Sequence, residues 1–376
     1  GAVIPPLGYA RVPADPAPAA PDPAARTAAG GMGLTLENEH LRVVVNDDGT
    51  LASLWHKGAA REALAAETDG QIRGNELWSF VDVPRAWEAW DVDASYPREG
   101  TAVPASEPPR RLDAHRIEVR RTLGESVITQ TYVLRPGMRR LDVETHAHWT
   151  GRRTLLRTHT RAAVRAANAT FESAYGAVER TTHMNTSWDA AHFESPAHRW
   201  VDLSEGGFGL SLLNDSKYGH SVYGSVLGLS LLRGPLYPDP TADEGEHRFT
   251  YSFFPHEGDW RGAGLAGTVG QADDLNAPVC LVRASAAGAA DAWPARQSFA
   301  QVQAGPGLRL GALKLTEDGN SLLLRLYDAH GSRGEAQVAV AGVHRWQEAN
   351  FLEEARGDVG GRWSYTPFRV VTLREA

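Results

Sequence analysis

Short runs of alternating apolar and polar residues, closed by tight turns, recur along most of this chain and constrain it to an antiparallel β fold. Leu41, Val43 and Val45 would share one face of a strand, because successive side chains of a strand point to opposite faces. Residues 46–49 (Asn-Asp-Asp-Gly) then supply a tight turn into a second strand over 51–55. Such a run can bury one face only by pairing and packing with others, which predicts a multi-stranded domain.

The same pattern predicts further strands, beginning with a three-stranded meander. The predicted strands cover 115–123, 127–134, 140–149, 207–213, 221–232, 247–255, 312–315, 321–327 and 368–373. Helical periodicity is nearly absent, and only 286–302 would hold a short helix, which Pro294 weakens. We therefore predict an all-β protein in three parts: an N-terminal extended segment and Pro/Ala-rich linker over 1–31, a large β-domain over 32–270, and a smaller β-sandwich over 271–376.

Charge and cysteine content exclude several classes of function. The formal net charge of -8 argues against nucleic acid or an anionic membrane as the main partner. No apolar run approaches the roughly 18 residues that a membrane span needs, and the start lacks the basic and apolar regions of a signal peptide. The single cysteine, Cys280, rules out a disulfide within the chain, and a reduced, cytoplasmic location is the simplest expectation.

The sequence contains none of the common catalytic fingerprints, namely GxSxG, GxGxxG after a strand, a Walker loop or HExxH. His146 and His148 would point to one face of a strand and could share a metal ion, but no third ligand is evident. Residues 239–245 space their oxygen-bearing side chains like a calcium loop, yet the glycine falls at position seven instead of six. We therefore assign neither a metal ligand nor a catalytic residue in this chain.

Clusters that combine aromatic, acidic and amide side chains are a stronger signal. They lie at 75–82 with Trp90 and Asp91 following, at 185–189, and at 214–218. Carboxylates and amides bind sugar hydroxyls, and aromatic rings stack on the C–H faces of sugars, so these loops favour a carbohydrate ligand. The alternative is that the 11 tryptophans are core residues of a β-domain. A glycosidase needs two carboxylates, one as acid and one as base or nucleophile, and the sequence does not give the distance between the carboxylates of these loops.

Four segments together resemble the α-mannosidases of glycoside hydrolase family 38, in the branch of bacterial, fungal and cytosolic animal enzymes. They include NDSKYGHSVYG (214–224) and LSLLRGPLYPDPTADEGEHRFTYSFFPH (229–256), together with 74–93 and 171–205. The likeness extends through 37–54 and 312–328, so it covers nearly the whole chain after the linker.

This resemblance implies a galactose-mutarotase-like antiparallel β-supersandwich followed by a smaller C-terminal β-sandwich. In the family, an N-terminal barrel-like domain precedes these parts and holds the catalytic zinc and the nucleophile of a retaining mechanism. This chain matches only the β part, so we expect no cofactor in it and zinc in an N-terminal catalytic domain. The chain also begins without Met on a Pro-Pro segment, and we expect that an upstream half is missing.

The resemblance thus predicts the C-terminal region of a retaining, zinc-dependent α-mannosidase that hydrolyses terminal α-mannosides. This region would shape the sugar cleft and stabilise the enzyme, and it would be inactive alone. Its expected partners are the N-terminal catalytic domain, α-mannoside glycans and further copies of itself in a homo-oligomer. The predicted substrate-binding residues are Asn214, Asp215, Lys217 and Tyr218, followed by Trp90, Asp91 and Asp189.

Three other interpretations stay open from the sequence. The chain could be a stand-alone carbohydrate-binding β-domain, which predicts affinity for mannose without an upstream domain. It could be a mutarotase-like epimerase or lyase with an acid/base pair on a concave sheet, which predicts turnover of a sugar by this chain alone. Finally, it could be a purely architectural domain without any sugar contact.

Overall fold

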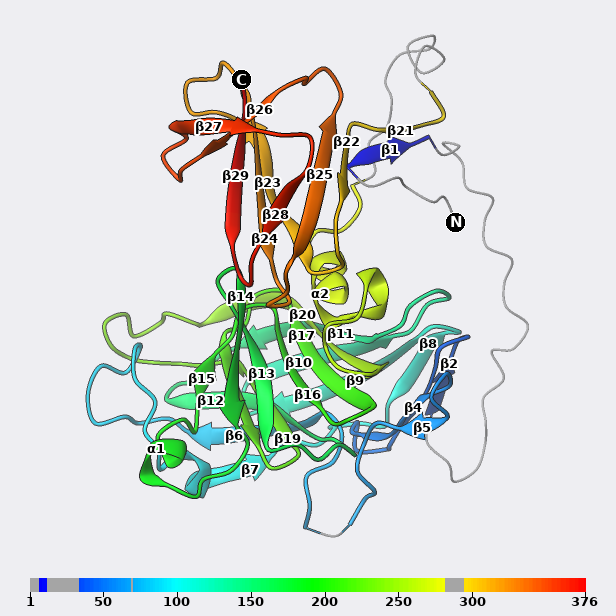
Figure 1. The fold of residues 1–376 in the computed structure, drawn as a ribbon. Helices are drawn as coiled ribbons and strands as arrows, with labels where there is room; N and C mark the ends of the chain where they lie inside the picture. Colours follow the sequence, from blue (N-terminus) through cyan, green and yellow to red (C-terminus); the bar gives the residue numbers. More distant parts are fainter. Residues whose placement is uncertain (1–6, 12–33, 69, 281–293) are drawn as a thin grey trace, which may run out of the picture. The chain divides into compact units, whose positions relative to one another are not determined.

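The computed structural model describes residues 7–11, 34–68, 70–280 and 294–376, and these are almost entirely β-strands joined by turns (Figure 1). This confirms the predicted all-β class. Residues 12–31 of the predicted linker lie outside the described residues. The longest described helix, α2 (Thr268–Asn276), has 9 residues, about half of what a membrane-spanning helix requires.

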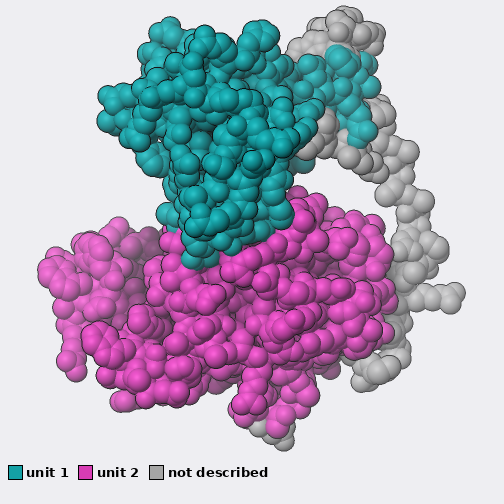
Figure 2. All heavy atoms as spheres, in the orientation of Figure 1, with its two compact units in different colours: residues 1–21, 174–177, 278–376 teal, residues 22–173, 178–277 magenta. Residues whose placement is uncertain are grey.

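The chain divides into two compact units, which Figure 2 distinguishes by colour. The larger unit comprises residues 22–173 and 178–277, and the smaller unit comprises residues 1–21, 174–177 and 278–376. The boundary predicted between 270 and 271 falls within α2.

In its described residues the larger unit contains three antiparallel sheets, and the first two residues of one strand, β14, belong to the smaller unit. A nine-stranded sheet has the order β14-β13-β16-β17-β20-β11-β10-β9-β8, and a six-stranded sheet has the order β15-β18-β19-β12-β6-β7. A four-stranded sheet of order β2-β3-β4-β5 completes the unit. The strands are β2 (Leu34–Glu37), β3 (Leu41–Val45), β4 (Leu51–His56), β5 (Arg61–Glu62), β6 (Glu76–Val81), β7 (Gly100–Ala102), β8 (Arg110–Asp113), β9 (Arg116–Leu123), β10 (Ser126–Val133), β11 (Leu141–Trp149), β12 (Thr154–Arg161), β13 (Asn168–Ser173), β14 (Gly176–Thr181), β15 (Ser195–Pro196), β16 (Trp200–Ser204), β17 (Phe208–Asn214), β18 (Gly219–Tyr223), β19 (Val226–Leu232) and β20 (Gly245–Glu257).

Three short helical segments accompany these strands. They are η1 (Tyr96–Glu99), α1 (Ser187–Ala190) and η2 (Gly264–Ala266).

The smaller unit is built from a three-stranded sheet of order β22-β25-β28, a five-stranded sheet of order β23-β24-β29-β26-β27, and the pair β1-β21. Its core includes Leu324, Leu326, Val371 and Leu373. These residues lie on two strands that are far apart in the sequence. The strands are β1 (Gly8–Ala10), β21 (Arg296–Ser298), β22 (Ala300–Gln303), β23 (Leu308–Leu315), β24 (Leu322–Asp328), β25 (Gly334–Val340), β26 (Trp346–Ala349), β27 (Ala355–Val359), β28 (Trp363–Tyr365) and β29 (Val370–Glu375).

Two predictions of local structure were wrong. The strand predicted over 221–232 is interrupted by a turn at Gly224, whose φ of 57° lies in the left-handed region, so β18 and β19 form a hairpin instead. The helix predicted over 286–302 is replaced by β21 and β22 in its described part, while 286–293 lie outside the described residues. The sequence analysis also missed α2.

A buried polar network joins the nine-stranded and six-stranded sheets in the core of the larger unit. Asn75, at the start of β6, donates through Nδ2 to the hydroxyl of Tyr132 (2.7 Å) and accepts through Oδ1 from the hydroxyl of Tyr251 (2.5 Å). Gln130 donates to the Tyr251 hydroxyl (2.7 Å) and accepts from Arg121 (2.6 Å). All five side chains are fully buried, so each hydrogen bond replaces one that water would otherwise supply.

Candidate functional site

The loop at 214–218 is shaped by the side chain of Asn214, which is buried at the end of β17. Its Oδ1 accepts hydrogen bonds from the backbone N–H of Ser216 (3.1 Å) and Lys217 (2.6 Å), as in an Asx-turn. Its Nδ2 donates to the carbonyl of His198 (3.1 Å) and lies 3.3 Å from Nε2 of His220. This engagement favours a shaping role for Asn214 over the direct sugar contact that the sequence predicted.

Asp215 ties the loop to β20 and keeps an exposed carboxylate. Its backbone N–H donates to the carbonyl of Thr250 (3.1 Å), and its Oδ2 accepts from the Thr250 N–H (2.8 Å). Its Oδ1 accepts from the Ser216 hydroxyl (3.0 Å). A carboxylate has about four acceptor positions. Asp215 is therefore held in place while it still offers acceptor positions to a ligand.

Lys217 lies beside a hollow in the larger unit. Its Nζ stands 4.0 Å from the centroid of the Phe249 ring, a cation–π contact. Burial lowers the pKa of Lys217, and the carboxylates of Asp215 and Asp243 oppose that shift. The hollow has a volume of about 230 Å³ and is lined by Lys217, Ser230, Leu231, Leu232, Arg233, Asp243 and His247.

Tyr218 borders a second hollow, of about 330 Å³, which has a different lining. The Tyr218 side chain is 62% exposed, and its ring meets the ring of His198 edge-on with centroids 6.0 Å apart. The other lining residues are Arg199, Asn214, Asp215, Ser216 and Asn276. The loop thus presents its polar and aromatic side chains to two hollows.

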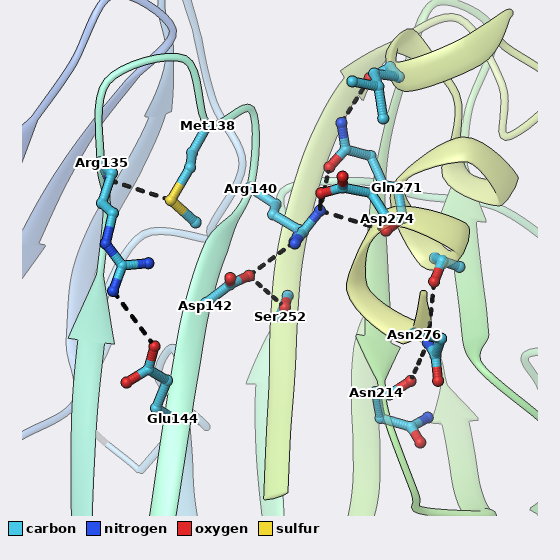
Figure 3. Close-up of polar contacts among 12 residues, drawn as sticks. Arg135, Met138, Arg140, Asp142, Glu144, Asn214, Ser252, Gln271, Asp274 and Asn276 are labelled. Atoms are coloured by element: carbon cyan, nitrogen blue, oxygen red, sulfur yellow. Dashed lines mark hydrogen bonds and ion pairs between the residues drawn. The ribbon is translucent and has the colours of Figure 1, made fainter. Parts of the chain in front are cut away.

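Helix α2 supports this loop through Asn276 (Figure 3), which also lines the second hollow. Asn276 donates through Nδ2 to the backbone carbonyl of Asn214 (3.0 Å). The helix is held by Arg140, which is buried and donates to Asp142 (2.8 Å), Gln271 (2.8 Å) and Asp274 (2.8 Å).

Arg199 binds the same helix at Asp273 (2.6 Å) and also pairs with Glu172. Sequence reasoning missed these supporting residues.

The predicted residues Trp90 and Asp91 are linked to the hollow of Lys217 through Arg233. The guanidinium of Arg233 pairs with the buried Asp82 (2.6 and 3.0 Å) and donates to the backbone carbonyl of Asp91 (2.7 Å). Arg233 also lines the hollow. The structure therefore brings two of the three sequence clusters to one region of the larger unit.

Asp189 is engaged elsewhere, in the short helix α1. Its Oδ2 accepts from the backbone N–H (3.0 Å) and hydroxyl (2.8 Å) of Thr186 in a capping box, and its Oδ1 accepts from Thr181 (3.2 Å). The hydrogen bond from the Thr186 hydroxyl is the main cause that lowers the pKa of Asp189. This arrangement gives the carboxylate a structural task at the helix start.

The two histidines considered as metal ligands share a carboxylate instead. His146 Nε2 lies 2.6 Å from one oxygen of Glu246, and His148 Nδ1 lies 2.8 Å from the other. These two hydrogen bonds lower the pKa of Glu246. In the part of the chain that the structure describes, no three His, Cys, Asp or Glu side chains are placed to hold a metal ion.

Family models place this chain in a known class of protein. Residues 36–241 match the Glycosyl hydrolases family 38 C-terminal domain, and residues 307–373 match the Glycosyl hydrolases family 38 C-terminal beta sandwich domain. The chain therefore belongs to glycosyl hydrolase family 38, as the resemblance of its motifs predicted, and forms the C-terminal region of such a protein.

Several of its relatives are named α-mannosidases. The chain is 39% identical to Alpha-mannosidase 2C1 of Homo sapiens over 361 residues, which cover 90% of this chain and 33% of the human protein. It is 35% identical to Alpha-mannosidase G of Dictyostelium discoideum over 306 residues, which cover 79% of this chain and 27% of that protein. The chain thus spans about a third or less of these relatives.

A solved alpha-mannosidase from Enterococcus faecalis V583 has the same fold. It superposes with a TM-score of 0.73 over 91% of this chain and 42% of that one, at 16% sequence identity. Since this identity is low, the comparison bears on the fold alone.

Proposed function

We propose that this chain is the C-terminal β region of a retaining, zinc-dependent α-mannosidase that hydrolyses terminal α-mannosides, and that its loop at 214–218 forms part of the rim of the sugar cleft. The observation that carries the proposal is this loop, which holds Asp215, Lys217 and Tyr218 at two hollows in a chain whose relatives include α-mannosidases. The partner would be the N-terminal catalytic part of the same enzyme. A cytoplasmic location belongs to the proposal and is supported by the single cysteine.

The described residues of this chain do not fit a catalytic zinc. The nearest set, His146, His148 and Glu246, is joined internally by hydrogen bonds that occupy both oxygens of Glu246, and it is not placed to hold a metal ion. We therefore assign zinc and the nucleophile to the N-terminal part and derive no chemical step from this chain.

The residues of the loop would act by positioning the sugar. Asp215 would accept hydrogen bonds from hydroxyl groups of mannose, because its carboxylate is exposed and fixed by Thr250. Lys217 would donate to hydroxyls in its hollow, and Tyr218 would pack its exposed ring on a C–H face. Interactions of this kind place the scissile bond correctly, and their loss lowers the rate without abolishing the chemistry.

The proposal is tested in an enzyme that joins this region to its N-terminal catalytic half. Asp215→Asn and Lys217→Met should each lower kcat/KM for an aryl α-mannoside by about 10- to 100-fold, which corresponds to roughly 1.4–2.8 kcal/mol. Tyr223→Ala, at an exposed tyrosine outside both hollows, is the matched control and should leave the rate unchanged. Unchanged kcat/KM in both loop variants would remove the loop from the cleft.

A simpler measurement separates this proposal from an enzyme that works alone. The 376-residue chain, confirmed as folded, should not hydrolyse the aryl α-mannoside with or without added zinc. Turnover that depends on zinc would contradict the proposal, because the metal site would then have to lie in this chain.

A further inference from the structure

Three large aromatic side chains stand together in solvent on the larger unit. Trp87, Trp90 and Tyr237 are 63%, 67% and 54% exposed, and we call them the aromatic cluster. Their ring centroids lie 6.1 Å (Trp87–Trp90), 6.4 Å (Trp87–Tyr237) and 6.4 Å (Trp90–Tyr237) apart, with interplanar angles of 78°, 53° and 59°. Contiguous apolar surface of this kind usually marks an interaction site, because burying it would release free energy.

Charged side chains brace the two segments that carry these rings. Glu88 accepts from the guanidinium of Arg153 (2.6 Å) and from the backbone N–H of Leu236 (2.8 Å), so it connects the segment of Trp87 to that of Tyr237. Arg233 connects the same segments by its bonds to Asp82 and to the carbonyl of Asp91.

The backbone of Trp87 also adopts a left-handed φ of 60°, which costs free energy in a residue other than glycine. The backbone segments that carry the rings are therefore tied together before a ligand binds, which reduces the entropy lost on binding.

The size and the rim of the cluster fit a saccharide better than a protein. A stable protein interface buries roughly 800 Å² per partner and uses about 20 residues or more, whereas this cluster consists of three side chains. The exposed carboxylates of Asp91 and Asp239 lie next to the rings in sequence, and charged residues are depleted at the centres of protein interfaces. Rings beside carboxylates suit a sugar, which presents C–H faces and hydroxyl groups together.

Arg233 also links the segment of Trp90 to the hollow of Lys217. Its side chain lines that hollow, and the same guanidinium donates to the carbonyl of Asp91, next to Trp90. A saccharide with its terminal residue at the hollow would therefore extend toward the rings. We infer that the aromatic cluster is a binding site for the second and third sugar rings of an α-mannoside oligosaccharide, an inference that rests on the function proposed above.

The test compares ligands of two lengths on the 376-residue chain by titration calorimetry. An α-linked mannotriose should bind at least 10-fold more tightly than methyl α-mannoside. Trp87→Ala and Trp90→Ala should each weaken binding of the trisaccharide by about 5- to 10-fold and leave methyl α-mannoside unaffected. Trp90→Phe, which keeps an aromatic face, should retain most of the affinity.

Tyr223→Ala is the matched control, because Tyr223 is 56% exposed on β18 and lies outside the cluster and both hollows. It should leave both affinities unchanged. Equal affinity for the two ligands, no measurable binding of mannotriose, or an effect of Trp87→Ala on self-association instead of on sugar binding would each overturn the inference. If Asp215→Asn and Lys217→Met still lower kcat/KM in the joined enzyme, the inference alone has failed and the proposed function stands.

Discussion

Replacing Arg140 with methionine should lower the free energy of unfolding of the larger unit by about 3 kcal/mol. The Arg140 guanidinium, whose side chain is 9% exposed, joins Asp142 of β11 to Gln271 and Asp274 of α2. Burial by itself would lower the pKa of Arg140, but Asp142 and Asp274 outweigh it and the pKa is raised. The cation is therefore a net stabilising partner in the folded chain.

The magnitude follows from what the substitution leaves behind. Removing one partner of a buried ion pair typically costs about 3–5 kcal/mol, because the other charge stays buried and unpaired. Asp142 is 11% exposed on its side chain but keeps a hydrogen bond from Ser252, and Asp274 is 50% exposed and can be hydrated. These two features place the cost near the lower end of the range. Methionine preserves most of the packing of the arginine stem.

The assay is urea unfolding of the 376-residue chain followed by tryptophan fluorescence, since Trp149 and Trp200 are buried in the larger unit. The control is Arg110→Met, because Arg110 forms a surface pair with Glu118 and is 69% exposed. That variant should lose less than about 1 kcal/mol. Equal, small losses in Arg140→Met and Arg110→Met would refute the reasoning, as would unchanged hydrogen exchange in α2.

Two further predictions concern the core of the larger unit. Burial lowers the pKa of His159 and of His220 to about 3. Below pH 6.5, protons therefore bind these histidines in the unfolded chain but not in the folded chain. The free energy of unfolding then falls as the pH falls toward 3, by up to roughly 1.4 kcal/mol per pH unit for each histidine. His220→Gln should make unfolding free energies measured between pH 6 and 4 less steep, and an unchanged slope would contradict the assignment. Tyr132→Phe should cost about 1–3 kcal/mol in urea unfolding, because it leaves the buried Nδ2 of Asn75 without its acceptor, while the carbonyl of Gly49 keeps a hydrogen bond from Arg121. The same change at the exposed Tyr223 should cost less than about 0.5 kcal/mol.

Strands whose signals are local were predictable from the sequence. The hairpin of β3 and β4 and the meander of β9, β10 and β11 are confirmed within one or two residues at each end. Each combines a period-2 pattern with a turn that demands glycine or polar residues, so sequence neighbours contain the necessary information.

Elements that depend on tertiary contacts were not predictable. Helix α2 has little amphipathic pattern, and its position depends on Arg140 and Arg199, which lie 128 and 69 residues before its first residue. The run over 221–232 is apolar enough for one long strand, and only the left-handed turn at Gly224 divides it. In both cases the structure is decided by a tertiary contact or a backbone conformation that the spacing of apolar residues does not reveal.

The candidate site shows the same limit. Its loop at 214–218 and Trp90 were identified from composition, yet Arg233, Asn276 and the grouping of Trp90 with Trp87 and Tyr237 emerged only from the structure. Arg233 lies 142 residues from Asp91, whose carbonyl it binds. The role of Asn214 could not be inferred either, because a buried Asx-turn and an exposed sugar ligand use the same residue type.

The network of Asn75, Gln130, Tyr132 and Tyr251 has a consequence for how the sheets align during folding. Apolar side chains on two facing sheets can exchange partners after a shift of two residues with little loss of burial. A shift of any strand here would separate hydroxyl, amide and guanidinium groups from their partners, and each would remain dehydrated. Structures with misaligned strands would therefore be less stable than the native one. The polar groups specify a single alignment of the strands, whereas leucine and valine alone would allow several alignments of similar stability.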